Sequence, residues 1–482
     1  MLALLLTLLV GLAPRSALSP AQSELPKGQV IEKVICASDA KQSYALYLPS
    51  NYSATRRWPV LYAFDPGARG KVPVERYREA AEKFGWIVAG SNNSRNGNLQ
   101  SSLDAWNGMV TDTTSRFAVD QRRAYATGFS GGARVALIFA IQCNSCLAGV
   151  IASGAGFPGA TEPSAKMQFA IFSTAGVDDF NFAEIKLLEE KLSRANIIHQ
   201  TEVFEGRHEW PPASVAESAI GWMELMAMKT GRRDRDESLI DAWSAARLKQ
   251  AQAFEDTRRP YDAYGIYLEL SLSLKGLRDV SGFETRASQL GNNREVRDEI
   301  RDEQQQIQRQ RDLEREIASL AAAGERARIQ ETDQRPTNTG RENDEGFDPN
   351  SRLHTVLTKL NRDAKGESDS ATRRVARRVL EGEFILLVER GQPILQAGRN
   401  YDEAVRIFTL ATDVAPERAS AFYHLAWAYI GKGDKKKSLR ALQTAAEKGF
   451  SDAAALTNNK AFDSIRNDPQ YQKIISSLKS QP

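Results

Sequence analysis

A serine flanked by glycines is the pattern in this chain with the clearest chemical meaning. The motif Gly128-Phe129-Ser130-Gly131-Gly132 follows the apolar run Ala124–Thr127 and precedes a helical pattern that ends near Ile141. The outer glycines allow a tight strand-to-helix turn, which leaves the serine hydroxyl projecting at the start of the helix. This context predicts that Ser130 is a catalytic nucleophile.

A serine hydroxyl is a weak nucleophile at neutral pH, so Ser130 needs a general base. The chain contains only four histidines. His354 and His424 lie in the helical second half of the chain, and His199 opens a predicted strand, where a structural role is expected. His208 follows the last predicted strand, in a loop that leads to a helix, and is therefore the predicted base.

An acidic residue is expected to hold the imidazole in its productive tautomer. Two adjacent carboxylates, Asp178 and Asp179, follow the predicted strand Phe169–Ser173. Both give the chain order Ser, Asp, His. The residue that is not the acid is expected to cap the helix beginning near Ala183 or to face water.

Backbone N–H groups must also stabilise the negative charge that develops on the carbonyl oxygen. The amide of Gly131 is the first predicted donor, because it follows the nucleophile. The second is expected from the loop Asp65–Gly70, where glycines let the backbone turn back over the sheet. Ala68 is the preferred residue of this loop and Gly67 the alternative.

Short apolar runs alternate with helix-period stretches between residues 30 and 229, which is typical of an α/β domain with a mostly parallel sheet. The predicted strands are Val30–Ile35, Tyr44–Leu48, Val60–Phe64, Ile87–Gly90, Ala124–Thr127, Gly149–Ser153, Phe169–Ser173 and Gln200–Phe204. The predicted helices are Val74–Phe84, Leu103–Phe117, Gly131–Ile141, Ala183–Ala195 and Ser214–Met228.

Beyond residue 230 the sequence is helical, and a repeat is visible near its end. Small and large apolar residues recur with an offset of 438 − 404 = 34 residues. This is the tetratricopeptide period, and the region 380–480 resembles such a repeat. The matched residues are Ala404, Phe408, Ala411 and Pro416 with Ser438, Leu442, Ala445 and Phe450. A weaker form of the same pattern occurs at Ala251, Phe254, Ala263, Tyr267 and Leu270.

These patterns predict a division of the chain into successive parts. The parts are a signal peptide (1–21), an α/β catalytic domain (26–231), a degenerate repeat-like helical region (235–330), a polar linker (331–352) and a tetratricopeptide-like domain (353–482). The first part rests on the apolar run Leu2–Leu12, which is too short to cross a bilayer and is followed by small residues around a cleavage site before Gln22. The mature protein is therefore expected to be exported, to the periplasm or the cell exterior, without a stable membrane span.

Composition and cysteines narrow the class of protein further. The 482 residues are 41% hydrophobic and 26% charged with a net charge of +3, which is typical of a globular protein. Basic and acidic residues are interleaved, so no nucleic-acid partner is expected. Cys143 and Cys146 lack further ligands for a metal site, and a local disulfide is the better interpretation in an oxidising compartment.

The stretch from Val119 to Gly132 resembles the esterase branch of the α/β-hydrolases that includes polyhydroxybutyrate depolymerase-like and feruloyl esterase-like enzymes. The resemblance covers about 200 residues and implies an eight-stranded α/β-hydrolase fold and ester hydrolysis through an acyl-enzyme, with no cofactor or metal. It also favours Asp179 over Asp178, because related hydrolases place the acid three residues after a glycine, here Gly176. The loop after the third strand reads Phe-Asp-Pro-Gly, where the family usually has a His-Gly type of sequence.

The expected function is therefore that of an exported carboxylic-ester hydrolase. Its substrate would be a small or polymeric ester, and its repeat helices would dock the substrate or a protein partner. Two alternatives stay open: a peptidase of the same fold, and an inert scaffold that acts through its repeats. Weaker candidates for the pocket wall are Trp106, Trp210, Asn92 and Asn93, for which packing is an equally common role.

Overall fold

The computed structural model describes residues 25–143, 145–333, 348–366 and 370–479. The predicted signal peptide, residues 1–21, lies outside these ranges. Within them, no helix combines the length and apolar character that a membrane span requires.

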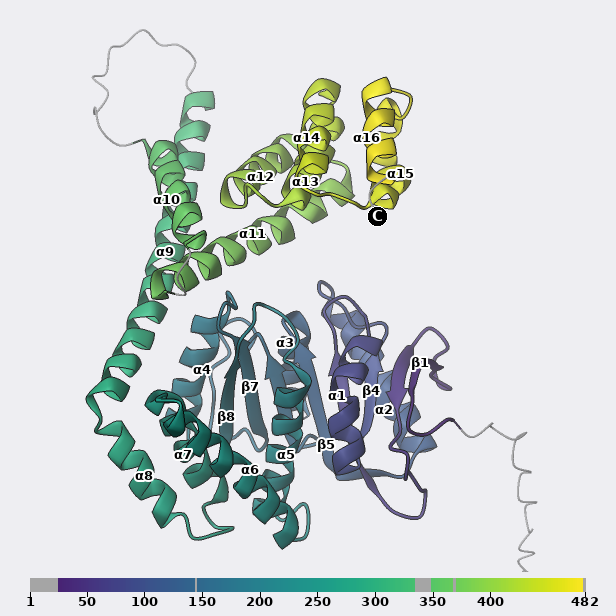
Figure 1. Cartoon of the computed structure of the whole chain (residues 1–482). Coiled ribbons are helices and arrows are strands. Elements are labelled where there is room, and N and C mark those ends of the chain that lie inside the picture. The colour runs from purple at the N-terminus through teal and green to yellow at the C-terminus, as the bar shows by residue number, and fades with distance from the viewer. Residues whose placement is uncertain (1–24, 144, 334–347, 367–369, 480–482) are drawn as a thin grey trace, which may run out of the picture.

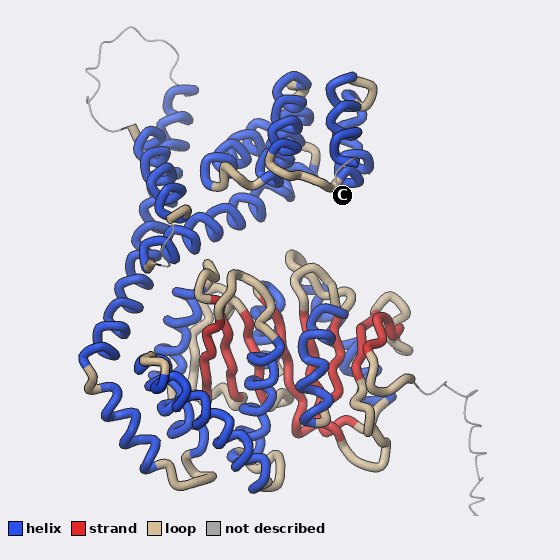
Figure 2. Tube along the Cα trace, in the orientation of Figure 1, coloured by secondary structure: helices blue, strands red, loops and turns tan. Residues whose placement is uncertain are grey.

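Eight strands form one sheet in the order β1-β2-β4-β3-β5-β6-β7-β8 (Figures 1 and 2). β1 and β2 pair antiparallel, and β2 is antiparallel to β4. The six strands β3 to β8 are mutually parallel. The strands are β1 Val30–Ile35, β2 Ser43–Tyr47, β3 Trp58–Phe64, β4 Ile87–Ser91, β5 Val119–Phe129, β6 Gly149–Ser153, β7 Ala170–Gly176 and β8 His199–Phe204. All eight predicted strands are present, and β5 begins five residues earlier than predicted, through the polar segment that precedes Ala124.

Helices cover both faces of this sheet. Residues of α1 (Lys71–Phe84) and α5 (Ala213–Lys229) pack on one face, and residues of α2 (Leu99–Arg116), α3 (Gly131–Gln142) and α4 (Phe182–Arg194) pack on the other. The central strands are buried throughout because both faces are covered, which explains their continuous apolar runs. Strand order and helix placement are those of the α/β-hydrolase fold, as predicted. In such sheets, functional side chains gather beyond the carboxyl ends of the strands.

Helices α6 (Glu237–Asp256), α7 (Pro260–Leu274) and α8 (Ser281–Gly291) extend the first layer. Buried residues of α6 and α7, such as Ala251 and Leu270, belong to the same apolar core as α5. The predicted boundary at 231–235 therefore lies between two helices that share a core.

The 40-residue helix α9 (Arg294–Asp333) leads from the α/β domain to the remaining helices (Figure 1). Its Leu313, Ile317 and Leu320 share a core with α10 (Pro349–Ala364) and α11 (Ala371–Ala397). The predicted polar linker 331–352 is partly helical, since α9 ends at 333 and α10 begins at 349, while 334–347 lie outside the described residues.

The segment with the 34-residue repeat forms α12 (Tyr401–Val414), α13 (Ala419–Gly431) and α14 (Lys435–Glu447), followed by α15 (Ala453–Asn458), a 3₁₀ helix (Lys460–Ile465) and α16 (Pro469–Lys479). The repeat positions Ala404, Phe408 and Ala411 are buried on α12, and their counterparts Ser438, Leu442 and Ala445 are buried on α14. The tetratricopeptide-like character of these helices stays a prediction.

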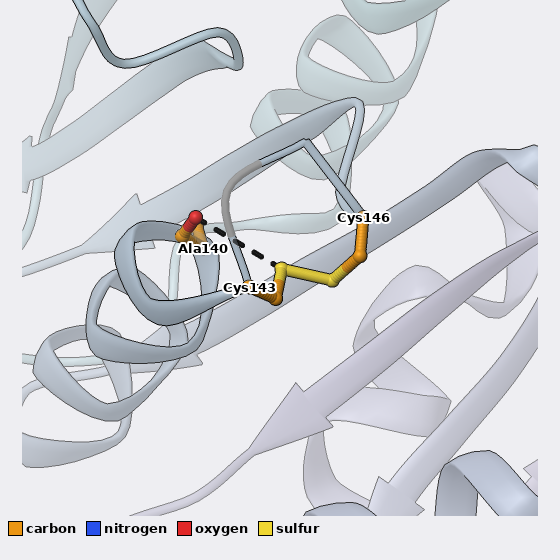
Figure 3. The surroundings of a disulfide bond; sticks show 3 residues. All are labelled: Ala140, Cys143 and Cys146. Carbon is orange, nitrogen blue, oxygen red and sulfur yellow. Dashed lines mark hydrogen bonds between the residues drawn. A yellow bond between two sulfur atoms is a disulfide. The ribbon is translucent and has the colours of Figure 1, made fainter.

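A disulfide joins Cys143 to Cys146 just after α3 (Figure 3). The two Cα atoms are 5.5 Å apart, and the Cys143 sulfur lies 3.9 Å from the carbonyl oxygen of Ala140 in the last turn of the helix. The bond closes a local turn, as the spacing of the cysteines predicts.

Candidate active site

Ser130 lies at the sharp turn between β5 and α3. Its backbone has φ +53° and ψ −121°, a conformation that residues other than glycine rarely adopt. The Ser130 N–H donates to the carbonyl of Ser153 on β6 at 2.8 Å, which ties the turn to the neighbouring strand. Strain of this kind is common at functional sites.

The glycines of the motif are required by close backbone contacts. A Cβ atom on Gly132 would lie 2.0 Å from the carbonyl oxygen of Phe64, and one on Gly128 would lie 2.1 Å from the carbonyl oxygen of Gly132. Both neighbours are backbone atoms and cannot move aside alone. The turn is therefore possible only without side chains at these positions.

We expect Gly132→Ala to lower the free energy of unfolding by about 2 kcal/mol or more, because the new methyl group overlaps the backbone of β3. Gly265→Ala is the matched control, since Gly265 lies in α7, where an added Cβ atom would face open space. That variant should be as stable as the wild type or slightly more stable. Thermal unfolding of both variants checks the prediction, and equal melting temperatures would contradict it.

Asp179 and His208 meet beyond the ends of β7 and β8. His208 Nδ1 lies 2.8 Å from Asp179 Oδ1, and the side chains are 13% and 1% exposed. Burial raises the pKa of Asp179, while the hydrogen bonds from His208 and from the Asn181 N–H oppose that rise. A carboxylate in this position can hold the Nδ1–H tautomer and leave Nε2 free to accept a proton.

Aromatic rings hold the imidazole beside the Ser130 turn. The His208 ring centroid is 4.6 Å from that of Phe129, the residue before Ser130, and 4.1 Å from that of Phe180. A Cβ on Gly154 would lie 3.2 Å from His208 Cε1, so this glycine lets the ring approach β6 closely. The structure thus places Ser130, Asp179 and His208 beyond the carboxyl ends of β5, β7 and β8.

The predicted oxyanion donors differ in the hydrogen bonds that their N–H groups already make. Gly131 is the first residue of α3, so its N–H has no intrahelical partner and points from the helix end. In contrast, the Ala68 N–H donates to the Asp65 carbonyl at 3.1 Å, and the Gly67 N–H donates to Asp65 Oδ1 at 2.8 Å. Both predicted amides of this loop are engaged within the loop itself, and their role as second donor stays a prediction.

Asp65 is the residue that shapes this loop, a role that its place in the sequence did not reveal. It is fully buried and accepts hydrogen bonds from Arg69 Nε at 2.8 Å and from Trp210 Nε1 at 2.9 Å. Burial acts to raise the pKa of Asp65, but the hydrogen bonds from Arg69 and Trp210 lower it below the usual value. Trp210 is thus a buried structural partner.

The other weak candidates also have structural roles. Trp106 packs against Tyr62 and Phe139. Asn93 accepts a hydrogen bond from the Ser43 N–H, and Asn92 donates to the Glu32 carbonyl, so both support the sheet edge.

Asn96 is a further side chain at the turn, and it was not among the predicted site residues. A Cβ on Gly131 would lie 1.8 Å from Asn96 Oδ1, so the Asn96 amide group lies directly over the start of α3. The Asn96 N–H donates to the Pro66 carbonyl at 2.9 Å, which fixes its loop to the Asp65 loop. A side-chain amide here can donate to an oxyanion. Four asparagines lie between residues 92 and 98, and nothing in their sequence pattern distinguishes Asn96 from the others.

Asp178 points away from the imidazole. Its Oδ2 accepts from Arg377 Nη1 of α11 at 3.0 Å. The expectation that the second carboxylate caps α4 or faces water is wrong, because the residue preceding α4 is Asn181 and Asp178 pairs with a distant arginine.

No protein-family model matches the sequence, and comparison with curated proteins gives no match. Among solved structures, the chain is similar to the fluorophosphonate-binding serine hydrolase F of Staphylococcus aureus (16% identity, TM-score 0.34, 41% of this chain and 99% of that one). It is also similar to a ferulic acid esterase (16% identity, TM-score 0.36, 41% of this chain and 98% of that one). A third similar structure is S-formylglutathione hydrolase of Staphylococcus aureus (16% identity, TM-score 0.34, 44% of this chain and 99% of that one). These structural neighbours are esterases and serine hydrolases.

Proposed function

We propose that the protein is an exported serine hydrolase that cleaves carboxylic esters through an acyl-enzyme. The observation that carries the proposal is the 2.8 Å hydrogen bond between the buried Asp179 and the partly buried His208, beside the strained Ser130 turn. The disulfide Cys143–Cys146 supports export, because such bonds persist in oxidising compartments.

In the first half of the reaction, Ser130 Oγ bonds to the ester carbonyl carbon and its proton passes to His208 Nε2. The carbonyl oxygen becomes an oxyanion, which the Gly131 N–H and a donor from the Asp65 or Asn96 loop stabilise. The intermediate collapses, the C–O bond to the alcohol breaks, and His208 returns its proton to the leaving alkoxide. In the second half, water gives a proton to His208 and its oxygen bonds to the acyl carbon. The bond between that carbon and Ser130 Oγ then breaks, His208 returns the proton to Ser130 Oγ, and the carboxylic acid leaves.

The helical half would then bring a substrate or partner to this site. Arg377 on α11 contacts Asp178 beside the acid, so α11 lies next to the carboxyl end of β7. The helices that follow α11 lie on the same side of the sheet (Figure 1). A polymeric ester or a protein chain bound along these helices would thus pass close to Ser130.

The test is labelling of the full-length protein by a fluorophosphonate probe, followed by an ester and a peptide panel. Wild type should be labelled, and Ser130→Ala should not. Ser193→Ala is a matched control, because Ser193 Oγ lies 3.1 Å from His199 Nε2 but at an exposed helix position without the turn. Wild-type protein that stays unlabelled would overturn the proposal in favour of the scaffold alternative. Turnover of peptides but not esters would change the proposed substrate class from esters to peptides.

A further inference from the structure

The loop that carries Asp179 is held by side chains of the helical half of the chain. Arg378 of α11 donates from Nε to the carbonyl of Val177 at 2.7 Å, and its Nη2 donates to the same oxygen. The guanidinium carbon lies 3.7 Å from the centroid of the Phe182 ring, and the Arg378 side chain is buried, at 1% exposure. A buried guanidinium carries a large desolvation cost. This one is directed at the backbone of the loop Val177–Asn181, which carries Asp179 and is called the acid loop below.

A second contact holds the other side of the same loop. Gln310 of α9, also 1% exposed, donates from Nε2 to the carbonyl of Phe180 at 2.7 Å. A Cβ on Gly382 of α11 would lie 3.3 Å from Phe180 Cβ, so the helix approaches the loop closely. The Phe180 ring in turn contacts the His208 imidazole at 4.1 Å.

These contacts bracket the acid, since Val177 and Phe180 stand on either side of Asp179. The carboxylate itself is placed by its neighbours, because its Oδ1 accepts from His208 and from the Asn181 N–H. A shift of the loop would therefore change the distance between Asp179 and His208.

We propose that Arg378 and Gln310 are positioning residues for Asp179, so that the helical half is a structural part of the catalytic site. This inference rests on the proposed function. A positioning role differs from a docking role, because it requires α9 and α11 even for the turnover of a small soluble ester.

Electrostatics give the proposal a second readout. Burial raises the pKa of Asp179, and the Arg378 charge is one of the effects that lower it. The other titratable and charged groups around this loop are His208 and the pair Asp178–Arg377, together with Arg374 of α11 and Glu303 of α9 near Arg378. Loss of the Arg378 charge should raise the pKa of Asp179, which favours its neutral form. The acid limb of the pH–rate profile, which belongs to the coupled Asp179–His208 pair, should then move to higher pH.

The experiment compares full-length Arg378→Met, Arg378→Lys and Gln310→Met with wild type and with Arg390→Gln. Arg390 is the control on the same helix, with a side chain that is 61% exposed. We expect kcat for p-nitrophenyl acetate to fall about 10–100-fold in Arg378→Met and Gln310→Met with little change in KM. The acid limb should move to higher pH in Arg378→Met, and Arg378→Lys should restore its position. Arg390→Gln should match wild type.

A purely structural role would lower the melting temperature without moving the pH profile, and that result would overturn the proposal. Should Arg378→Met not fold, the kcat of Gln310→Met tests the positioning role through the neutral contact to the Phe180 carbonyl, and an unchanged kcat in that variant would overturn it. NMR titration of ¹³C-labelled histidine, assigned with His208→Asn, follows the Asp179–His208 pair without turnover. An altered titration in Arg378→Met combined with an unlabelled wild type would reject the enzymatic function but retain the positioning role. An unaltered titration would reject the positioning role alone.

Discussion

Ser130→Ala is expected to lower kcat for p-nitrophenyl acetate by about 10⁶-fold, which is the usual loss when a triad nucleophile is removed. In the proposed mechanism the Ser130 Oγ atom forms the acyl-enzyme, so no other group in the site can replace it. Alanine meets the same backbone strain at φ +53° as serine, and the turn should therefore keep its shape. The rate is measured with the full-length protein, alongside its melting temperature.

The control for this prediction is Ser193→Ala, which removes the hydroxyl beside His199. His199 Nδ1 lies 2.7 Å from the Ile197 carbonyl oxygen, so this imidazole has a backbone partner where His208 has Asp179. Its activity should equal that of wild type. A Ser130→Ala variant that keeps wild-type kcat would remove Ser130 from the mechanism and the ester hydrolase proposal with it.

The fold was predictable because local signals agreed with the tertiary structure. The strands that are buried on both faces, such as β6 (Gly149–Ser153), read as continuous apolar runs between turns. The predicted bounds of β1 and β6 match the observed ones, and the fold class follows from the alternation of these strands with helices. The start of β5 was missed because Asp120 to Arg123 are polar and lie near its exposed end.

The candidate site was predictable in part. The glycine motif specified a turn whose close contacts leave no room for side chains at 128 and 132, and the small number of histidines reduced the choice of base to one. The choice between Asp178 and Asp179 could not be made from the local pattern, because both follow the same strand. What separates them is a partner about 200 residues away, Arg377, whose position depends on the packing of α11.

Contacts between loops were invisible for the same reason. Asp65 and Trp210 are 145 positions apart, and Arg378 and Val177 are 201 apart. Hydrogen bonds of this kind depend on where the chain returns in space, whereas hydrophobic periodicity reports only on neighbours along the chain. The sequence therefore predicted a separate docking domain for the helical half. Its contacts with the acid loop could be found only in the folded structure.

Asp179→Asn is expected to lower kcat by about 10⁴-fold, with a smaller effect on KM. The amide that replaces the carboxylate favours the wrong imidazole tautomer, and it cannot stabilise the imidazolium that forms when Ser130 gives up its proton. The measurement is the kinetics of p-nitrophenyl acetate hydrolysis, with unfolding of the same samples as a check on the fold. Asp179 is buried at 1% exposure, so water cannot substitute for the missing charge.

Asp178→Asn is the matched control, since it makes the same chemical change one residue earlier in the same loop. Asp178 Oδ2 accepts from Arg377, so its replacement weakens one partly exposed ion pair and leaves the His208 hydrogen bond in place. We expect kcat to stay within about tenfold of wild type, the size of effect that a residue supporting the acid loop would have. Equal losses in the two variants would mean that the loop acts as a unit and that the 2.8 Å contact does not identify the acid. A larger loss in Asp178→Asn would instead transfer the acid role to Asp178, which would require the loop to turn over and to break the contacts from α11 during catalysis.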